Sequence, residues 1–587
     1  MLRRALPFLL CTLLVGCEGT KPLVSYQVAA TSGDAQTDTV TRVLPVSLVA
    51  TVRGENGDPA AGVSVLWMVQ SGGGSVAATT VTDASGQVSA TWTLGSVAGT
   101  QTVRVAAGGG NAMFTATALP AAPTQSSKNA GDQQSNAPNS ALPVPYAVLV
   151  QDQYGNAVPD VTVNWAAAAG QGSVSNATTL TDAAGVARTT HTLGPNLGPD
   201  SVLATVPVLN DTLRFVSTGL RQAILVATVG IPANYGIHDT FVRDGIAFVC
   251  AWNSGVMIFD VGNGIKGGSP SIPKPISTII TNASGIAAGA DVHNAWWFWN
   301  PNTGEQKYLF VGQEGPAFGG IGNGSSGLIH VVDVSDLAHP TEVAYFHKAG
   351  PDSTGTHNFW MDETNQILYA AYYNGGVVAL DVSGTLSGNL ATRLIDSLRI
   401  GGVGNTYTWG VQLYNGSLYA VDMLSGLWQL NTSNGDLSFA AGGNNVPERF
   451  GSDLWVANGY AYTGTWGGFF RTANVPGNAV KIWQLGVTGA PTLVDSIITT
   501  GIATVSDIEV SANGKLLMFS TENGPNAGVH FYSLADPAHP AFLYKYLVST
   551  GVHTATFGYI GGRVYAFGAK DPGSPALMIW DVTSLTQ

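Results

Sequence analysis

The chain contains two copies of one sequence pattern, displaced by 98 residues, and this repeat constrains the fold more than any other feature. Trp67 in the first copy corresponds to Trp165 in the second. The pattern T-D-x-x-G begins at Thr82 and again at Thr181, after one inserted residue. Between turn signals each copy alternates apolar and polar residues, which predicts short, half-buried strands. Such strands over this length are typical of a β-sandwich.

A second and different repeat occupies residues 220–587. Its units contain an apolar strand that ends in Asp-Val, most clearly at Asp260, Asp333, Asp381 and Asp581. The units begin at His238, His293, His357, Trp409, Ser452, Ser506 and His553, with a mean spacing of 52.5 residues. Four strands with their turns fill that length, and seven units lie within the usual range of about 4 to 8 propeller blades. We therefore expect a seven-bladed β-propeller.

The two ends of this second repeat are complementary. The last unit ends at Asp581 without a fourth strand, and an apolar segment at residues 223–229 precedes the first unit. An exposed strand edge invites pairing with other chains, and joining these two segments would remove it. We expect residues 222–229 to pair with the strand that ends at Asp581 and so to close the ring.

Composition excludes several other classes of protein. The 587 residues include 74 Gly, and only 10% of them are charged, against a usual value of about 25%. Helical bundles need Leu, Glu, Lys and Arg in quantity, so this composition excludes them and favours strands with tight turns. The net charge of -13, without a local stripe of Lys and Arg, argues against nucleic acid as a partner.

The N-terminus has the features of an export signal. Arg3 and Arg4 precede an apolar run over residues 5–15, which is far shorter than the ~20 residues of a membrane-spanning helix. The run ends in L-V-G-C, which resembles the bacterial lipobox, where cleavage precedes the cysteine and its thiol receives a diacylglycerol. This resemblance implies lipidation of Cys17 and a membrane anchor, and Glu18 favours the outer membrane. An ordinary cleavable signal with a chance cysteine is the alternative reading.

Both repeats resemble known families. The glycine turn, the apolar run ending in Trp and the T-D-x-x-G pattern resemble bacterial immunoglobulin-like domains of the invasin and intimin type, which usually act as stiff spacers. The Asp-Val units resemble the LVIVD repeat of bacterial β-propellers. The predicted fold is all-β, with two Ig-like β-sandwiches followed by a seven-bladed β-propeller. The predicted segments are the signal peptide at 1–16, a lipidated N-terminus and tether at 17–24, the sandwiches at 25–119 and 120–219, and the propeller at 220–587.

Four of the ten histidines share one position in the second repeat: His238, His293, His357 and His553. The innermost strand of each blade is expected to begin there, so these side chains should crowd the mouth of the central channel. Converging neutral imidazoles can bind Zn or Cu. The alternative is that each histidine stabilises its own blade corner through backbone hydrogen bonds. After cleavage and lipidation Cys250 is the one remaining cysteine, and its alternating context predicts a buried strand thiol.

The loops between the second and third strands should emerge on the same face as these histidines. Together with the start of the fourth unit they supply the candidate ligand-binding residues Trp252, Glu314, Tyr373, Trp409, Trp466 and Glu522. Aromatic and acidic groups around a concavity suit a carbohydrate, peptide or protein ligand, although the same aromatics could pack between blades. The longest such loops are 313–326 and 467–479. The G-x-G-x-x-G match at 322–327 lies between two strands, so we interpret it as a hairpin loop rather than a phosphate site.

The leading interpretation is a surface-anchored bacterial lipoprotein of the cell surface or periplasm. Its Ig-like spacers would present the propeller for binding or adhesion to an extracellular carbohydrate, peptide or protein. Its lipid would anchor the chain in the membrane. No catalytic motif is recognised, which favours a binding module over an enzyme, and no catalytic residue is assigned. The alternative is a metal-dependent oxidase or hydrolase that uses Zn or Cu at the four histidines, with Glu314 or Glu522 as a base.

Overall fold

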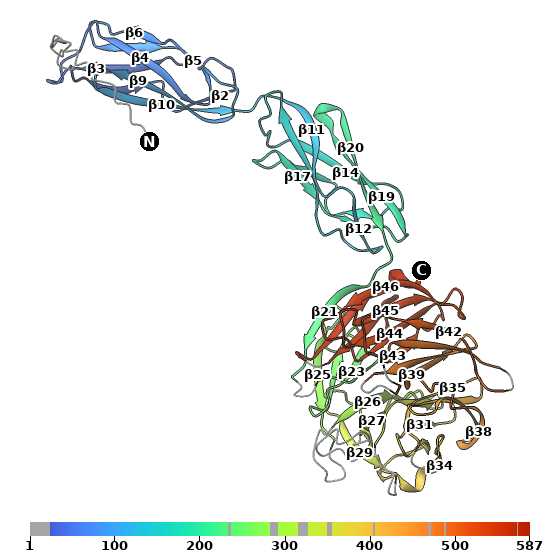
Figure 1. Ribbon diagram of the computed structural model, residues 1–587. Coiled ribbons are helices and arrows are strands. Elements are labelled where there is room, and N and C mark those ends of the chain that lie inside the picture. Colours follow the sequence, from blue (N-terminus) through green and yellow to red (C-terminus); the bar gives the residue numbers. More distant parts are fainter. Residues whose placement is uncertain are drawn as a thin grey trace, which may run out of the picture. The chain divides into compact units, whose positions relative to one another are not determined.

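The computed structural model describes residues 24–232, 236–281, 291–314, 327–348, 355–402, 405–467, 471–472, 474–486, 489–571 and 573–587. The chain divides into two compact units, Met1–Gly219 and Leu220–Gln587, and in both the described residues are mainly strands (Figure 1). The helices of the described part are three short 3-10 turns: η1 (Pro207–Leu209), η2 (Ala391–Arg393) and η3 (Thr583–Thr586). None of the helices that the structure describes has the length and apolar character needed to cross a bilayer. The predicted signal peptide and Cys17 lie outside the described residues.

The first unit contains two sandwiches with the same strand order. The first pairs sheets β1-β3-β7 and β2-β10-β9-β4-β6, and the second pairs β11-β13-β17 and β12-β20-β19-β14-β16, each with a small two-stranded sheet. The strands of the first are β1 (Gln27–Ser32), β2 (Gln36–Thr39), β3 (Leu48–Arg53), β4 (Ser64–Ser71), β5 (Gly74–Val76), β6 (Thr79–Val81), β7 (Gln87–Ala90), β8 (Trp92–Leu94), β9 (Gly99–Ala107) and β10 (Gly110–Leu119). Those of the second are β11 (Pro123–Ala130), β12 (Gln134–Asn136), β13 (Tyr146–Asp152), β14 (Thr162–Ala167), β15 (Ser173–Val174), β16 (Thr178–Leu180), β17 (Val186–Thr189), β18 (His191–Thr192), β19 (Gly198–Val206) and β20 (Asp211–Gly219).

The T-D-x-x-G pattern fixes the same corner in both sandwiches. In the second, the Thr181 hydroxyl donates to the carbonyl of Val158 at 2.8 Å and accepts the N–H of Val161 at 2.9 Å. The next residue, Asp182, accepts the backbone N–H groups of the tight turn that follows. Thr82 makes the equivalent pair of bonds in the first sandwich. The repeated residues are therefore buried hydrogen-bonding groups that hold the corner between two sheets.

The second unit is a β-propeller whose described residues form seven sheets, six of four strands and one of five. The first strand of each sheet lines a central cavity, so these strands are innermost: β22 (Asp239–Arg243), β26 (Val292–Trp297), β30 (Phe359–Asp362), β35 (Thr408–Tyr414), β39 (Phe450–Ala457), β43 (Thr504–Val510) and β47 (Thr554–Ile560). The second strands are β23 (Ile246–Cys250), β27 (Tyr308–Gln313), β31 (Ile367–Ala371), β36 (Ser417–Asp422), β40 (Tyr460–Trp466), β44 (Leu516–Glu522) and β48 (Arg563–Lys570). The third strands are β24 (Val256–Asp260), β28 (Ile329–Asp333), β32 (Val377–Asp381), β37 (Gly426–Ser433), β41 (Ala479–Gln484), β45 (Gly528–Ser533) and β49 (Ala576–Asp581). The outer strands are β21 (Ile224–Gly230), β25 (Lys274–Ile279), β29 (Thr341–Phe346), β33 (Gly388–Asn389), β34 (Leu394–Leu398), β38 (Asp436–Gly442), β42 (Thr492–Ile498) and β46 (Ala541–Leu547).

The recurrent Asp-Val pair ends the third strand of a blade in a specific turn. The carboxylate of Asp381 accepts the N–H of Ser383 at 2.9 Å, and Asp333 and Asp581 make the equivalent bond to the residue two positions later. The following Val382 is buried and donates its N–H to the carbonyl of Gln366 at 2.9 Å. The motif therefore extends the pairing of the second and third strands at the end away from their hairpin turn, and its valine enters the core.

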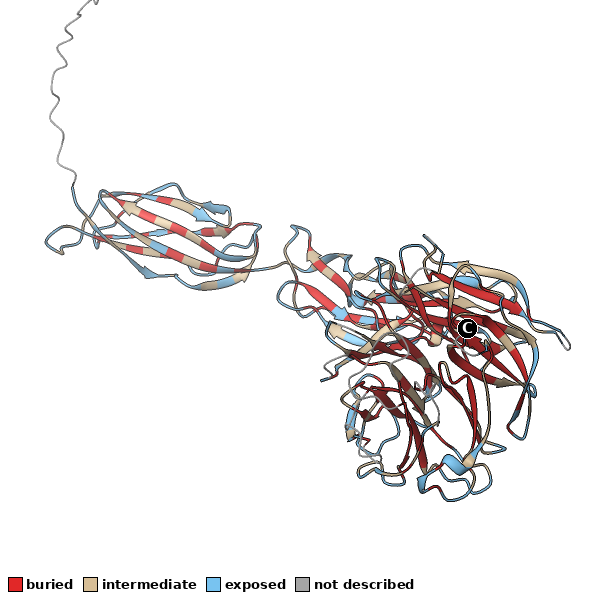
Figure 2. Ribbon diagram, turned by 60° about the horizontal axis from the view of Figure 1, so that its bottom comes forward, coloured by how far each residue is buried: buried red, intermediate tan, exposed pale blue. Residues whose placement is uncertain are grey.

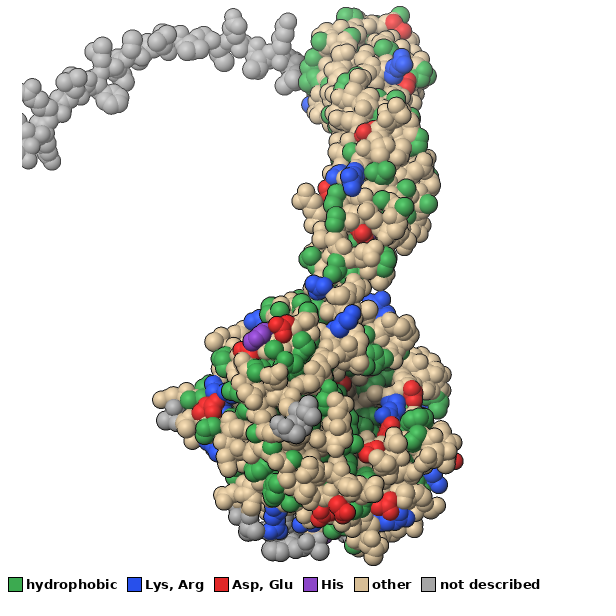
Figure 3. Space-filling model, turned by 90° about the vertical axis from the view of Figure 1, so that its right-hand side faces the viewer, with side chains coloured by type: hydrophobic (Ala, Val, Ile, Leu, Met, Phe, Trp, Pro, Cys, Tyr) green, Lys and Arg blue, Asp and Glu red, His purple; other side chains and the backbone are tan. Residues whose placement is uncertain are grey.

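The ring is closed by a strand from the other end of the unit. β21 pairs with β49 in antiparallel register, from Ile224 opposite Asp581 to Gly230 opposite Ala576, so the expected closure is confirmed. Figure 2 shows the inner strands of the blades as largely buried, and Cys250 at the end of β23 is fully buried, as predicted. Figure 3 shows charged side chains of both signs scattered over the surface.

Candidate metal centre at the propeller mouth

The four equivalent histidines lie together at the start of the innermost strands. The ring centroids of His293 and His357 are 4.0 Å apart, those of His238 and His553 are 4.4 Å apart, and those of His238 and His293 are 5.2 Å apart. The same backbone hydrogen bond positions three of them. Each donates its backbone N–H, at 2.8–2.9 Å, to the carbonyl of the last or next-to-last residue of the second strand in its blade; the three are His238, His357 and His553. The repeat thus places imidazoles from four blades in one cluster.

Three of these imidazoles have a ring nitrogen without a hydrogen-bond partner. In the described part of the chain the buried Nδ1 atoms of His238, His293 and His357 accept and donate no hydrogen bond. Buried polar atoms are almost always satisfied, so such a group of three requires an explanation. The fourth histidine differs, because Nδ1 of His553 lies 3.1 Å from a carboxylate oxygen of Glu522. Carboxylates commonly orient metal-binding histidines in this way, leaving the other ring nitrogen available.

Carboxyl groups complete two sets of potential metal ligands. Ligand atoms of His293, Glu314 and His357 lie within 4.8 Å of one another, and so do those of His238, His553 and Asp571. Nε2 of His238 is 4.0 Å from Glu314, which links the two sets. Imidazole nitrogen and carboxylate oxygen are the usual ligands of Zn and also suit Cu.

The imidazoles of this cluster differ in charge. Burial holds the pKa of His238, His293 and His357 well below the ordinary value, with a further contribution from the neighbouring histidines. Burial also acts to lower the pKa of His553, but the charge and hydrogen bond of Glu522 outweigh it and raise that pKa to about 9. At neutral pH the cluster therefore contains three neutral imidazoles and one His553–Glu522 ion pair.

Two buried acids at the same mouth titrate near neutrality. Burial raises the pKa of Glu314 to about 7, although the hydrogen bond from the Tyr373 hydroxyl favours its charged form. Burial likewise raises the pKa of Asp291 to about 6. One carboxylate oxygen of Asp291 also lacks a hydrogen-bond partner among the described residues. These acids can exchange protons close to the imidazoles at physiological pH.

The aromatic residues expected to bind a ligand surround the histidines instead of standing on an open surface. Trp252 packs on His238 with centroids 4.1 Å apart, and Trp409 packs on His357 at 4.2 Å. Trp466 in turn contacts Trp409 at 6.1 Å. Of these residues Trp252, Trp409 and the nearby Tyr373 are at most 8% exposed. They therefore form the walls of the histidine cluster.

Two of these wall residues have strained backbones. Trp252 and Tyr373 follow the second strands of their blades and have φ values of 49° and 40°, in the left-handed region. Bulky side chains rarely occupy that region, which costs roughly 1–2 kcal/mol per residue. Contacts to His238 and His357 accompany this strain. Residues with strained backbone conformations are concentrated at functional sites, where the packing around them holds the strained conformation in place.

Sequence analysis missed two acids of the cluster, Asp291 and Asp571. Asp571 directly follows β48, so it occupies the same loop position as Glu314 and Tyr373 in other blades. This shared position in the repeat could have predicted that Asp571 belongs to the cluster. Asp291 directly precedes β26 and has no acidic counterpart there in the other blades. Most of the predicted loop 313–326, including most of the G-x-G-x-x-G match, lies outside the described residues, and so do residues 468–470 and 473 of the loop 467–479.

Comparisons with known proteins identify one domain type. Residues 128–208 match the family model of the bacterial Ig-like domain (group 1), which covers most of the second sandwich. Among solved structures, the crystal structure of the WD40 β-propeller domain of Doa1 matches with 9% identity and a TM-score of 0.39, covering 62% of this chain and 97% of that one. No curated protein matches the chain.

Proposed function

We propose that this chain is an exported bacterial lipoprotein whose Ig-like sandwiches present a seven-bladed propeller, and that the propeller mouth binds one Zn or Cu ion. The metal would take part in binding an extracellular ligand at the surface of the cell. The observation that carries the proposal is the set of four equivalent histidines, three of which have a buried, unpartnered Nδ1 atom. A metal ion bound by imidazoles of this cluster would account for the convergence of these groups in one place.

The first part of this proposal rests on domain composition. A bacterial Ig-like domain joined to a β-propeller fits a surface or adhesion role. The predicted export signal and the lipidation of Cys17 would place the chain at the membrane, with the outer membrane favoured. The first sandwich has the strand order and the Thr82 corner of the second, which supports its assignment as another Ig-like domain.

The metal site is proposed to use nitrogen ligands from His238, His293 and His357. His553 would be a fourth ligand through Nε2, held in orientation by Glu522. Metal binding to His553 displaces its proton, so affinity should rise with pH up to about 9. Removing His293 and His357 at once should abolish high-affinity binding, because two of the four proposed histidine ligands then remain, whereas Zn sites use three or four protein ligands.

Calorimetric titration of the metal-free full chain with Zn²⁺ and Cu²⁺ tests this proposal. We expect one equivalent to bind, and the variant His293→Ala/His357→Ala to lose at least about a hundredfold in affinity. His530→Ala is the matched control, because His530 is also a buried propeller histidine but stacks on Phe519 away from this cluster. Equal binding by all three proteins, or none by the wild type, would contradict the proposal.

A second candidate function is a metal-dependent oxidase or hydrolase. The observation that favours it is Glu314, whose pKa of about 7 suits a general base and which lies in the same ligand set as His293 and His357. In this case Glu314→Gln should abolish turnover of ester or phenolic test substrates while metal remains bound. Screening the Zn-loaded and Cu-loaded protein against such substrates, with probe arrays of glycans and proteins in parallel, distinguishes catalysis from binding alone.

A further inference from the structure

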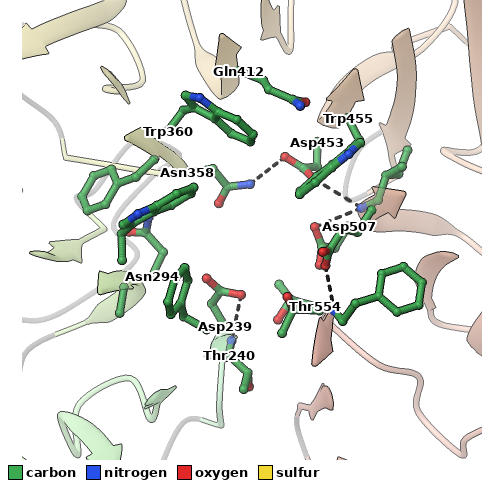
Figure 4. Close-up of a pocket in the computed structure, with 18 of the residues that line it drawn as sticks. Asp239, Thr240, Asn294, Asn358, Trp360, Gln412, Asp453, Trp455, Asp507 and Thr554 are labelled. Carbon is green, nitrogen blue, oxygen red and sulfur yellow. Dashed lines mark hydrogen bonds between the residues drawn. The ribbon is translucent and has the colours of Figure 1, made fainter. Parts of the chain in front are cut away.

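The central cavity that the innermost strands line extends along the channel beyond the histidines. Its volume is about 280 Å³, and all seven innermost strands contribute to its wall (Figure 4). Each of these strands begins at the histidine level. Phe241 and Trp296 lie three residues after His238 and His293, which places them about 10 Å further along the channel. None of the four histidines lines the cavity, although the residues that directly follow them do: Asp239, Asn294, Asn358 and Thr554.

Aromatic rings from four blades form one part of the cavity wall. Trp296 contacts Phe241 on one side and Trp360 on the other, with centroids 5.3 Å and 5.5 Å apart, and Trp360 contacts Trp455 at 5.9 Å. All four side chains are half-buried. A ring of adjacent aromatic faces that keeps partial solvent access is the arrangement that proteins use to bind organic cations.

Carboxyl groups line the cavity beside this ring. Asp453, Asp507 and Glu509 come from two neighbouring blades, and each accepts a backbone N–H of its own or the next innermost strand. Burial raises the pKa of Asp453 to about 6 and that of Glu509 to about 8. Burial together with the neighbouring Asp453 holds the pKa of Asp507 well above its ordinary value. The acids thus face one another without a compensating positive charge.

The basic residue in the wall is already paired. Arg243 is the one Lys or Arg among the lining residues, and its guanidinium lies 2.6 Å from Glu363. The side-chain oxygen of Asn294, which lines the cavity and is 3% exposed, has no hydrogen-bond partner among the described residues. The cavity therefore offers one unused acceptor and several acids that a bound cation would favour in their charged form, and within the described residues it has no free cation to pair with them.

We propose that this cavity binds a small organic ammonium ion, whose N–H groups contact Asp453 and Asp507 while its carbon chain packs on the aromatic ring of Phe241, Trp296, Trp360 and Trp455. Its size and chemistry favour this ligand over a metal ion. A volume of about 280 Å³ is several times that of a water molecule. In the described part of the chain, both sets of three or more ligand groups close enough for a metal lie at the histidine mouth.

The test is binding of 1,5-diaminopentane to the full chain, followed by calorimetry and by quenching of tryptophan fluorescence. We expect saturable binding, with 1,5-pentanediol, the neutral analogue, binding at least about tenfold more weakly. Asp507→Asn keeps an acceptor for the N–H of Ala555 but cannot ionise to pair with an ammonium group, so it should weaken diamine binding at least about tenfold. Trp360→Leu should weaken it about fivefold or more.

Two matched variants show whether a loss is specific. Asp396→Asn removes a carboxylate that accepts the N–H of Leu437 outside the cavity, and Trp428→Leu removes a half-buried tryptophan on β37. Both should leave diamine binding unchanged. Zn²⁺ binding at the histidine mouth, measured on the same samples, separates this proposal from that of the metal centre. Absence of saturable diamine binding, equal binding of the diol, or equal losses in the control variants would overturn the proposal.

Discussion

At the scale of single residues, the decisive feature is that chemically identical side chains behave differently within one cluster. His238, His293 and His357 are buried next to one another and remain neutral, whereas His553 is held charged by Glu522. A single carboxylate therefore sets which imidazole carries the positive charge. This division matters for metal binding, because only the neutral form of an imidazole can coordinate.

The variant Glu522→Gln should reverse the behaviour of His553. Burial lowers the pKa of His553, and the Glu522 carboxylate is the main group that counteracts this effect. Without it, the pKa of His553 should fall from about 9 to about 6.5 or lower. A histidine whose pKa is raised by folding stabilises the folded state fully when the pH is below its pKa in the unfolded chain, and it loses this contribution as the pH rises through about 9. The variant should therefore be destabilised relative to the wild type more at pH 6 than at pH 9. NMR titration of labelled histidines in metal-free protein measures the shift.

The exposed His539 provides an internal control for that titration. The carboxylate of Asp495 raises its pKa, and this pair lies on the outer part of the propeller. Its titration should be the same in both proteins. A His553 resonance that still titrates near pH 9 in the variant would contradict the assigned role of Glu522.

The sequence predicted the histidine cluster but not the acidic cavity, for a physical reason that individual positions illustrate. The histidines repeat as the same residue type at one position of the repeat, so their convergence follows from that shared position. One residue further on, the channel is lined by Asp239, Asn294 and Asp453, which share polarity but not identity. Burial of Trp252 and Tyr373 could not be predicted either, because it depends on how a loop folds over the neighbouring blade.

At the scale of elements, the Asp that ends the third strand of four blades organises the segment after it through hydrogen bonds to the backbone. Asp260 represents the strongest case, since its carboxylate accepts the N–H groups of Gly262, Gly264, Lys266 and Gly268 at 2.7–3.2 Å. Although burial opposes it, these donors hold the pKa of Asp260 well below its ordinary value. The recurrent Asp therefore anchors the segment that follows the third strand in the four blades that contain it.

Replacing Asp260 by Ala should destabilise the propeller more than the same change at Asp381. Asp260 satisfies four backbone donors, whereas Asp381 accepts one backbone N–H and pairs with the partly exposed Arg393. We expect losses of about 3 kcal/mol and about 1 kcal/mol respectively in the free energy of unfolding. Urea unfolding of the full chain measures both, and equal losses would show that the loop anchor is not specific to Asp260.

Ring closure is the second prediction at this scale. A truncated chain that begins at residue 220 retains β21, and one that begins at residue 231 loses it and exposes the edge of β49. We expect the first to unfold cooperatively and the second to melt at a lower temperature and to aggregate. Calorimetry with light scattering compares them. Identical melting of the two proteins would mean that closure contributes nothing to stability.

At the scale of the whole molecule, the chain joins a β-rich unit with a bacterial Ig-like domain to a β-propeller. Hydrogen-bonding corners and alternating strands made the fold class predictable, because both repeat many times along the chain. The sandwich strands and the Asp-Val turns follow from such repeated residues, whereas the ring closure follows from the fourth strand that the last unit lacks. Segments without a repeat, such as the long loops at the mouth, offer no comparable signal.

The proposed anchor is tested by replacing Cys17 with Ala. Because lipid chains hold a protein at a membrane through burial of their methylene groups, the variant should appear in the soluble fraction after cell lysis. Membrane fractionation with metabolic labelling by a fatty acid analogue measures the change. Continued membrane association of an unlabelled Cys17→Ala protein would contradict the lipidation of this residue.

The most direct test of the central claim is X-ray absorption at the metal edge of the full chain loaded with one equivalent of Zn²⁺. The proposed centre predicts a first shell of nitrogen and oxygen at about 2.0–2.1 Å with the multiple scattering of three or more imidazoles, and loss of that signal in His293→Ala/His357→Ala. A shell of oxygen alone, or a spectrum unchanged by the substitution, would contradict a metal centre at the propeller mouth.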